Sequence, residues 1–185
     1  MLVPMRWRND RMGYGLAAIL LHWTMTVLVV GLFVLGDYMV RLDYYHPWYR
    51  AAPWWHQGLG VVLGLLWLLR LAWRLADPPP RPLGAPWERR AALAVHRLLY
   101  LLMATVVISG YLQSTADGRG VDLFGWLELP ATLQGLPGQA DLAGAWHRWL
   151  AWALILLAAL HTLAALKHHF IDRDDSLRRM LLPRR

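Results

Sequence analysis

Four apolar stretches dominate the sequence, and each is about 20 residues or longer, the length that a helix needs to cross a hydrocarbon core of ~30 Å. They cover about residues 15–36, 54–73, 91–113 and 144–167. Backbone N–H and C=O groups inside lipid must pair within their own segment, so such stretches fold as α-helices. We therefore expect an all-α integral membrane four-helix bundle, with residues 1–185 forming a single membrane domain.

The amino-acid composition is that of a membrane protein, and it limits which cofactors the chain can bind. Hydrophobic residues make up 57% of the chain, charged residues make up 17%, and 12 residues are Trp, which favours the membrane–water boundary. The chain has no Cys, which excludes disulfides, Cys-held iron–sulfur clusters and covalently attached c-type haem. A haem in this chain is therefore held non-covalently, through His or Met.

The basic residues flank the apolar stretches, so the net charge of +7 reflects membrane topology and not a nucleic-acid partner. With both termini on one side of the membrane, that side holds 15 of the 19 Lys and Arg residues. These are Arg6, Arg8, Arg11, Arg70, Arg74, Arg81, Arg89, Arg90, Arg97, Lys167, Arg173, Arg178, Arg179, Arg184 and Arg185. The positive-inside rule then places both termini in the cytoplasm.

Two of the connecting loops have distinct compositions. Residues 76–88 contain a run of prolines, which ends one helix and does not allow another to start. The longest loop, residues 114–143, is rich in Gly. Within it we expect residues 123–129 to form a short amphipathic helix on the membrane surface.

Five histidines lie inside the apolar stretches, where an ionisable side chain is a functional-site hypothesis by default, and four of them pair by depth. With cytoplasmic termini, His22 and His161 lie at a similar inner depth, and His56 and His147 lie near the outer surface. His147 and His161 are separated by about 21 Å along one helix and by about 40° around it, so they face one seam. Because a b-type haem takes an axial ligand on each side of its plane, these depths predict two stacked haems in the bundle core.

A strip of small residues runs along the second apolar stretch, at Gly58, Gly60 and Gly64. Such a strip makes room for a haem beside the helix. Close packing of two helices is the alternative explanation, and it accounts for Gly60 and Gly64 at least as well.

Two further histidines, His96 and His168, each allow two interpretations. His96, near the inner end of the third stretch, has nearly the same depth as His22 and His161, so depth alone does not decide which two of the three hold the inner iron. His168 follows His161 by seven residues, which places it on the same helix face at the cytoplasmic boundary. An imidazole there either hydrogen-bonds a quinone carbonyl and delivers protons or is an ordinary interfacial residue.

An ordered set of motifs over nearly the whole chain resembles the prokaryotic cytochrome b561 family, small dihaem quinone oxidoreductases of the inner membrane. Singly each motif is weak, but together they are specific. They are Leu21-His22-Trp23, His56 with Gly60, Leu68-Leu69-Arg70-Leu71, His96, Trp146-His147, His161, Lys167-His168-His169 and Leu177-Arg178-Arg179-Met180.

The resemblance implies that His22 and His161 bind the inner haem and that His56 and His147 bind the outer haem, which leaves His96 as a haem or quinone contact. It also implies two haem b cofactors, ubiquinone as a bound substrate and a place in the bacterial inner membrane. The expected function is an oxidoreductase that transfers electrons between a periplasmic donor and ubiquinone.

The resemblance also suggests which electron donor this protein uses. One family member resembles a superoxide oxidase, so superoxide is the candidate donor here. The outer segments carry four Arg against six carboxylates, a formal net charge of −2, whereas capture of an anion benefits from a positive funnel. Superoxide oxidation is therefore the weaker part of the hypothesis.

Two other functions compete with this one. The chain is alternatively a membrane cytochrome b anchor that relays electrons for a partner subunit, a separate soluble oxidoreductase. A haem-free transporter that uses His for metal ions or protons is the second alternative. It is disfavoured because the spans contain no close His, Asp and Glu cluster with metal-ligand spacing.

Overall fold

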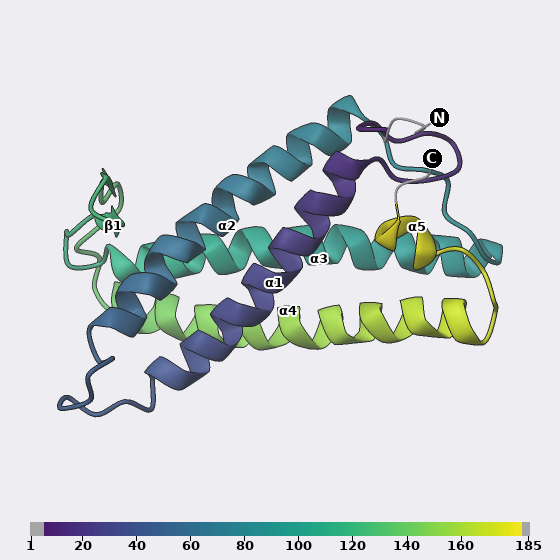
Figure 1. The fold of residues 1–185 in the computed structure, drawn as a ribbon. Helices are drawn as coiled ribbons and strands as arrows, with labels where there is room; N and C mark the ends of the chain where they lie inside the picture. The colour runs from purple at the N-terminus through teal and green to yellow at the C-terminus, as the bar shows by residue number, and fades with distance from the viewer. Residues whose placement is uncertain (1–5, 183–185) are drawn as a thin grey trace. The chain divides into compact units, whose positions relative to one another are not determined.

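The computed structural model describes residues 6–182 and consists mainly of four long helices (Figure 1). They are α1 (Leu16–Met39), α2 (Ala51–Ala76), α3 (Pro86–Ser114) and α4 (Gln139–Phe170). Each helix is long and apolar enough to span a bilayer, so the expected all-α fold with four spans is confirmed. Two residues of the expected cytoplasmic basic set, Arg184 and Arg185, lie outside the described residues.

The helices extend beyond the apolar stretches because hydropathy marks only the part of a helix that lies in hydrocarbon. α4 begins at Gln139, five residues before the expected span, and the side chain of this residue hydrogen-bonds the preceding loop and the end of α3. The Gln139 Oε1 accepts the N–H of Leu136 at 3.3 Å, and its Nε2 donates to the carbonyls of Leu112 and Leu133 at 2.9 and 3.0 Å. The Gln139 side chain therefore ties the start of α4 to the end of α3.

The expected surface helix over residues 123–129 is wrong, because this segment is an antiparallel hairpin of β1 (Val121–Leu123) and β2 (Leu127–Leu129). Phe124 and Gly125 both have positive φ angles, 57° and 75°, which reverse the chain and are incompatible with an α-helix. The Asp122 carboxylate accepts the Gly125 N–H at 2.8 Å and stabilises the turn. Amphipathic spacing alone did not reveal this turn.

The chain divides into two compact units, and every long helix contributes a segment to each. The first unit comprises Met1–Thr26, Leu66–Tyr100 and Leu156–Arg185. The second unit comprises Val27–Leu65 and Leu101–Ile155. The short helix α5 (Arg178–Leu181) belongs to the first unit, and the hairpin belongs to the second.

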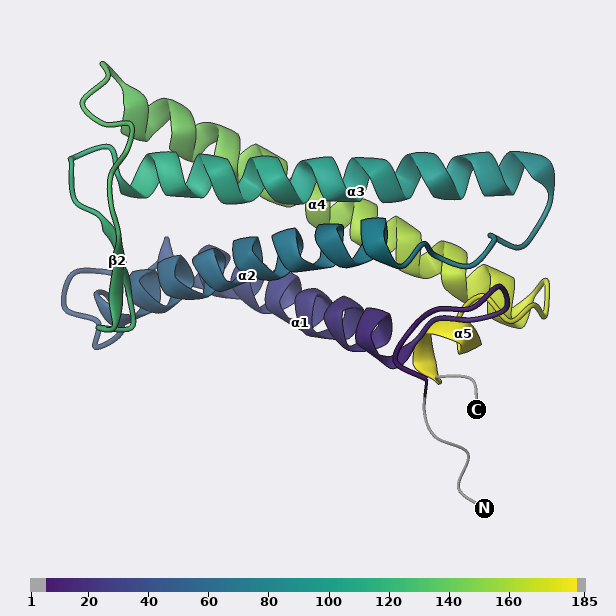
Figure 2. The same cartoon turned by 90° about the horizontal axis from the view of Figure 1, so that it is seen from above.

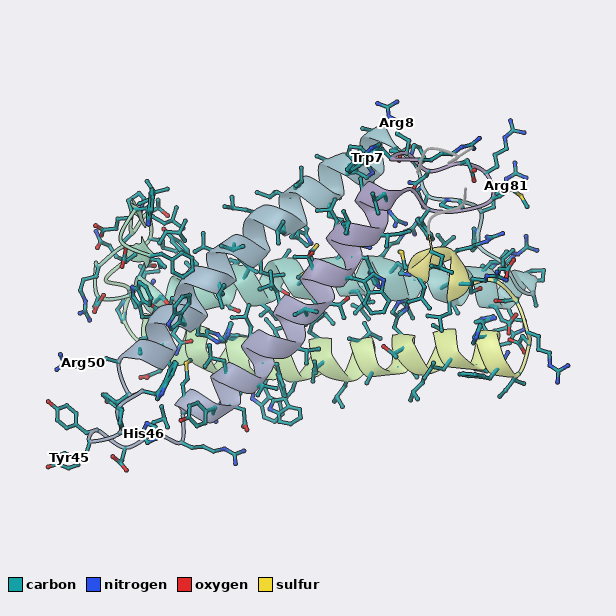
Figure 3. The ribbon with its side chains drawn as sticks, in the orientation of Figure 1. Trp7, Arg8, Tyr45, His46, Arg50 and Arg81 are labelled. Atoms are coloured by element: carbon teal, nitrogen blue, oxygen red, sulfur yellow. The ribbon has the colours of Figure 1, made fainter. Side chains whose placement is uncertain are left out.

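In the first unit, the segments before α1 and after α4 pack against the helices. Asn9 donates its backbone N–H to the Asp77 carboxylate at 2.8 Å, which ties the segment before α1 to the end of α2. The Trp23 indole N–H donates to the Met180 carbonyl at 2.8 Å and holds α5 against α1 (Figure 2). Arg8 and Arg81 lie exposed on the loops of this unit (Figure 3). These loops carry much of the basic charge expected on one side of the membrane.

In the second unit, the helix segments pack through aromatic rings and small residues. The rings of Phe33 on α1 and Trp152 on α4 meet edge to face, 4.8 Å between centroids. The loop between α1 and α2 carries Tyr45, His46 and Arg50 (Figure 3). The hairpin lies beside the start of α2, where the Trp54 indole N–H donates to Asp122 at 2.7 Å.

Two of the three glycines on α2 are explained by packing. A Cβ on Gly58 would lie 2.7 Å from the ring of Phe124, the turn residue of the hairpin. A Cβ on Gly64 would lie 3.0 Å from Val107 on α3. At Gly60, a Cβ would meet no described atom within 4 Å. Close approach of neighbouring groups therefore accounts for Gly58 and Gly64.

Candidate functional site

Three partly buried histidines meet in the first unit, each from a different helix. The imidazole of His161 on α4 lies 6.5 Å from that of His22 on α1 and 5.1 Å from that of His96 on α3, measured between ring centroids. Both ring pairs are close to perpendicular, with interplanar angles of 79° and 65°. His161 is therefore the shared member of two candidate pairs.

Two partly buried histidines meet in the second unit. The imidazoles of His56 on α2 and His147 on α4 lie 6.0 Å apart with an interplanar angle of 83°. The Nδ1 of His147 lies 2.9 Å from the Val106 carbonyl, which can only accept, so this nitrogen carries the proton. The Nε2 of His147 then keeps its lone pair, which is the state required of a metal ligand.

A basic side chain lies against the histidines of the first unit. Arg70 on α2 donates from Nη2 to the Nδ1 of His22 at 3.2 Å and from Nε to the Tyr100 hydroxyl at 3.0 Å. Arg74, one turn further along α2, places its guanidinium over the Tyr100 ring, 5.7 Å from the centroid. Arg70 lies near the end of the second apolar stretch, and the structure turns its side chain toward His22.

His168 lies at the end of α4 within a cluster of carboxylates. Its Nδ1 is 3.0 Å from Asp172 and 2.9 Å from Asp174, and Lys167 bridges Asp172 and Glu88 at 2.7 and 2.8 Å. Burial raises the pKa of Asp174, but hydrogen bonds from Ser176 and the nearby His168 outweigh it, so the pKa lies below its usual value. The Asp174 carboxylate is therefore ionised at neutral pH and fixes the orientation of the imidazole.

Comparison with known proteins assigns the chain to a family. The family described as prokaryotic cytochrome b561 matches residues 13–183. The chain belongs to the prokaryotic cytochrome b561 family. Family membership makes it a transmembrane electron-transport protein of the oxidoreductase class, and cytochromes of the b type bind haem b.

Several individual cytochromes are similar over almost their full length. Cytochrome b561 homolog 2 of Escherichia coli is 48% identical over 179 residues, 96% of this chain and 95% of that protein. Cytochrome b562 of Cereibacter sphaeroides is 33% identical over 177 residues, 93% of this chain and 97% of that protein. The probable superoxide oxidase CybB of Yersinia pestis is 29% identical over 177 residues, with the same coverage.

The histidine pairs of this cytochrome b561 differ in how well they fit a haem. Two imidazoles that bind one iron from opposite sides have centroids roughly 6 Å apart, because each metal–nitrogen bond is about 2 Å and each nitrogen lies about 1 Å from its ring centre. The separations of 6.5 Å for His22 with His161 and 6.0 Å for His56 with His147 match this span. At 5.1 Å, His96 and His161 are too close.

Two glycines lie against the histidines of this cytochrome b561 and were not anticipated from the sequence. A Cβ on Gly36 would lie 3.1 Å from the ring of His56, and a Cβ on Gly110 would lie 2.9 Å from the ring of His147. Neither residue can therefore be enlarged without displacing an imidazole.

Both glycines could have been identified from a fourteen-residue spacing in the sequence. On each long helix, two site positions are fourteen residues apart, which returns the helix to within about 40° of the same face. The four pairs of positions are His22 and Gly36, His56 and Arg70, His96 and Gly110, and His147 and His161. Counting fourteen residues from each histidine leads to Gly36, Arg70 and Gly110.

Proposed function

We propose that this cytochrome transfers electrons between a one-electron donor at the periplasmic face and ubiquinone at the cytoplasmic face of the bacterial inner membrane. The observation that carries the proposal is the pair of histidine sites, one in each unit, whose ring separations of 6.5 and 6.0 Å suit two iron ligands. When bound, haem b supplies an iron centre that accepts and releases one electron at a time.

The ligand assignment follows from these distances. His22 and His161 hold the inner haem, and His56 and His147 hold the outer haem. His96 packs against His161 at 5.1 Å, and we assign it as a contact of the inner site and not as an iron ligand. The hydrogen bond from His147 to Val106 orients one ligand ring of the outer site.

The orientation rests on the distribution of basic residues. The loops before α1 and between α2 and α3, the segment after α4 and the adjoining ends of the helices carry 15 of the 19 Lys and Arg residues. The positive-inside rule places these segments in the cytoplasm. His168 then lies at the cytoplasmic boundary, where quinone meets water.

We assign His168 to the quinone site. Its Nδ1–H is held by Asp172 and Asp174, so Nε2 donates to a quinone carbonyl when the ring carries both protons, as an imidazolium. Reduction of a quinone to a quinol consumes two electrons and two protons. The carboxylates around His168 connect it to cytoplasmic water, so a proton lost from the imidazole is replaced from that side.

Superoxide is the donor suggested by the name of the Yersinia pestis relative. The expected outer arginines give limited help in attracting this anion, because Arg41 pairs with Asp37 at 2.7 Å and Arg119 pairs with Asp117. Arg50 and Arg148 appear in no ion pair among residues 6–182. These two side chains are the candidates for contact with a small anionic donor.

The purified chain is expected to contain about two haem b groups per polypeptide. A reduced-minus-oxidised spectrum with pyridine haem quantification measures this number. Addition of a superoxide source and a soluble ubiquinone is then expected to yield quinol without any second protein. A protein without haem contradicts the proposal and supports the transporter alternative. Turnover that requires a co-purifying soluble subunit supports the anchor role.

Replacement of His168 with Gln is expected to slow ubiquinone reduction by about tenfold or more, because proton transfer by a positioned side chain contributes at least that much. The haem spectrum is expected to stay unchanged. His169→Gln is the matched control, since that ring contacts Phe170 and is adjacent in sequence. Stopped-flow measurement of the quinone reduction rate distinguishes the two variants. Equal rates would remove His168 from the quinone site.

A further inference from the structure

A small cavity in the first unit is lined by ten residues, six of which carry side-chain hydrogen-bond donors. It measures about 30 Å³ and lies beside the last turns of α2, where Arg70, Trp73 and Arg74 face Tyr14 and Tyr100. This volume accommodates a group the size of a carboxylate, comparable to one water molecule in the liquid. Burial raises the pKa of the Tyr14 phenol despite the nearby arginines, so this hydroxyl keeps its proton and can donate.

One buried donor of this cavity has no acceptor among the described residues. The Trp73 indole nitrogen is buried and has no hydrogen-bond partner among residues 6–182. The carboxylate on the lining, Asp77, accepts the backbone N–H of Asn9 at 2.8 Å. A buried donor without an acceptor is costly, so the cavity favours an anionic or carbonyl oxygen.

The hydrogen bond between Arg70 and the Nδ1 of His22 must break when His22 binds iron. A guanidinium can only donate, so the Nδ1 of His22 must accept in the observed contact at 3.2 Å. If Nε2 binds iron, a neutral imidazole carries its proton on Nδ1, and two donors then face one another. If Nδ1 binds iron, it has no lone pair for Arg70. In both cases Arg70 must turn away from His22 and find another acceptor.

We propose that Arg70 and Arg74, with the indole N–H of Trp73, bind a propionate carboxylate of the haem that His22 and His161 hold. This inference rests on the proposed function. The planar guanidinium matches a carboxylate with two parallel hydrogen bonds, and two arginines balance the negative charge. Arg70 already touches a proposed iron ligand, so a short rotation of its side chain brings it to a substituent of the same haem.

An anionic lipid headgroup offers the same oxygen chemistry. Arg74 lies near the end of α2, in reach of a headgroup at the membrane surface. Arg70 lies one turn deeper and contacts His22, which favours a ligand that is itself close to the iron site. The two sources predict different results when Arg70 is replaced.

The test is a potentiometric titration of the purified holoprotein carrying Arg70→Gln. A cation next to the propionate stabilises the reduced haem, so its loss is expected to lower the midpoint potential of one haem and leave the other unchanged. Arg70→Lys keeps the charge but not the planar fork, and it is expected to restore part of the potential. Arg90→Gln, an exposed position on α3 of the same unit, is the matched control and is expected to cause no shift.

The outcomes separate the proposals. Unchanged potentials in Arg70→Gln, with less phospholipid co-purifying, would overturn the propionate site in favour of a lipid headgroup. Unchanged potentials with unchanged phospholipid would overturn it outright. If Arg70→Gln does not accumulate, Arg70→Lys decides, since no shift in that variant contradicts the proposal. Failure of the proposed function is distinct, because it appears in the unaltered protein, as a lack of haem or as a lack of ubiquinone reduction without a second protein.

Discussion

Replacement of His161 with Ala is expected to lower the haem content from about two to about one haem b per chain, because one of the two axial ligands of the inner iron is lost. His161 lies 6.5 Å from His22 between ring centroids, the separation that two ligands of one iron require. The remaining haem is expected to keep its spectrum and its midpoint potential, since its proposed ligands His56 and His147 lie in the other unit. Pyridine haem quantification and a redox titration measure both effects.

His96→Ala is the matched control for this variant. It removes an imidazole of the same unit, 5.1 Å from His161, but not an assigned ligand. Both haems are expected to remain, with a small change in the potential of one of them. Loss of a haem from His96→Ala, together with retention in His22→Ala, would exchange the roles of these two residues.

Gly110→Leu is expected to remove the outer haem, although it replaces no proposed iron ligand. Even a Cβ at this position would lie 2.9 Å from the Cε1 of His147 and 3.0 Å from its Nδ1, so a leucine side chain must displace the ring. Displacement breaks the 2.9 Å hydrogen bond to Val106 that orients His147. The expected haem content is again about one per chain.

The control for this change is Gly31→Leu, a glycine on α1 of the same unit where an added Cβ meets no described atom within 4 Å. That variant is expected to keep both haems. An intact inner haem in Gly110→Leu shows that the chain still folds, so the measurement separates local displacement from general misfolding. A full haem complement in Gly110→Leu would mean that His147 is not held where we place it.

The spans were predictable from the sequence because hydrocarbon thickness sets a minimum length for an apolar run. The helix ends were not, since α4 starts at a polar residue, Gln139, whose side-chain amide hydrogen-bonds the preceding loop and α3. The hairpin at residues 121–129 was not predicted because its turn depends on Phe124 in a left-handed conformation. This conformation is uncommon for Phe, so the residue type gives no indication of it. Amphipathic spacing is similar for a short helix and for this hairpin.

The histidine pairs were predictable in part. Depth along each span matched His22 with His161 and His56 with His147, but it left His96 equivalent to His22. Ring separations, which depend on the rotation of each helix about its axis, distinguish the two. The same rotation turns Arg70 toward His22 and away from the surface. The depth of a residue along its span does not reveal which way its side chain faces around the helix.

The fourteen-residue repeat constrains how these helices can change length. Each helix must present a chosen face twice, for example at His147 and His161 on α4. One inserted residue between two such positions would swing the second by about 100°, and insertions near four or seven residues come closest to restoring the direction. Adaptation to a thicker or thinner bilayer is therefore confined to the ends of the helices, beyond the paired positions.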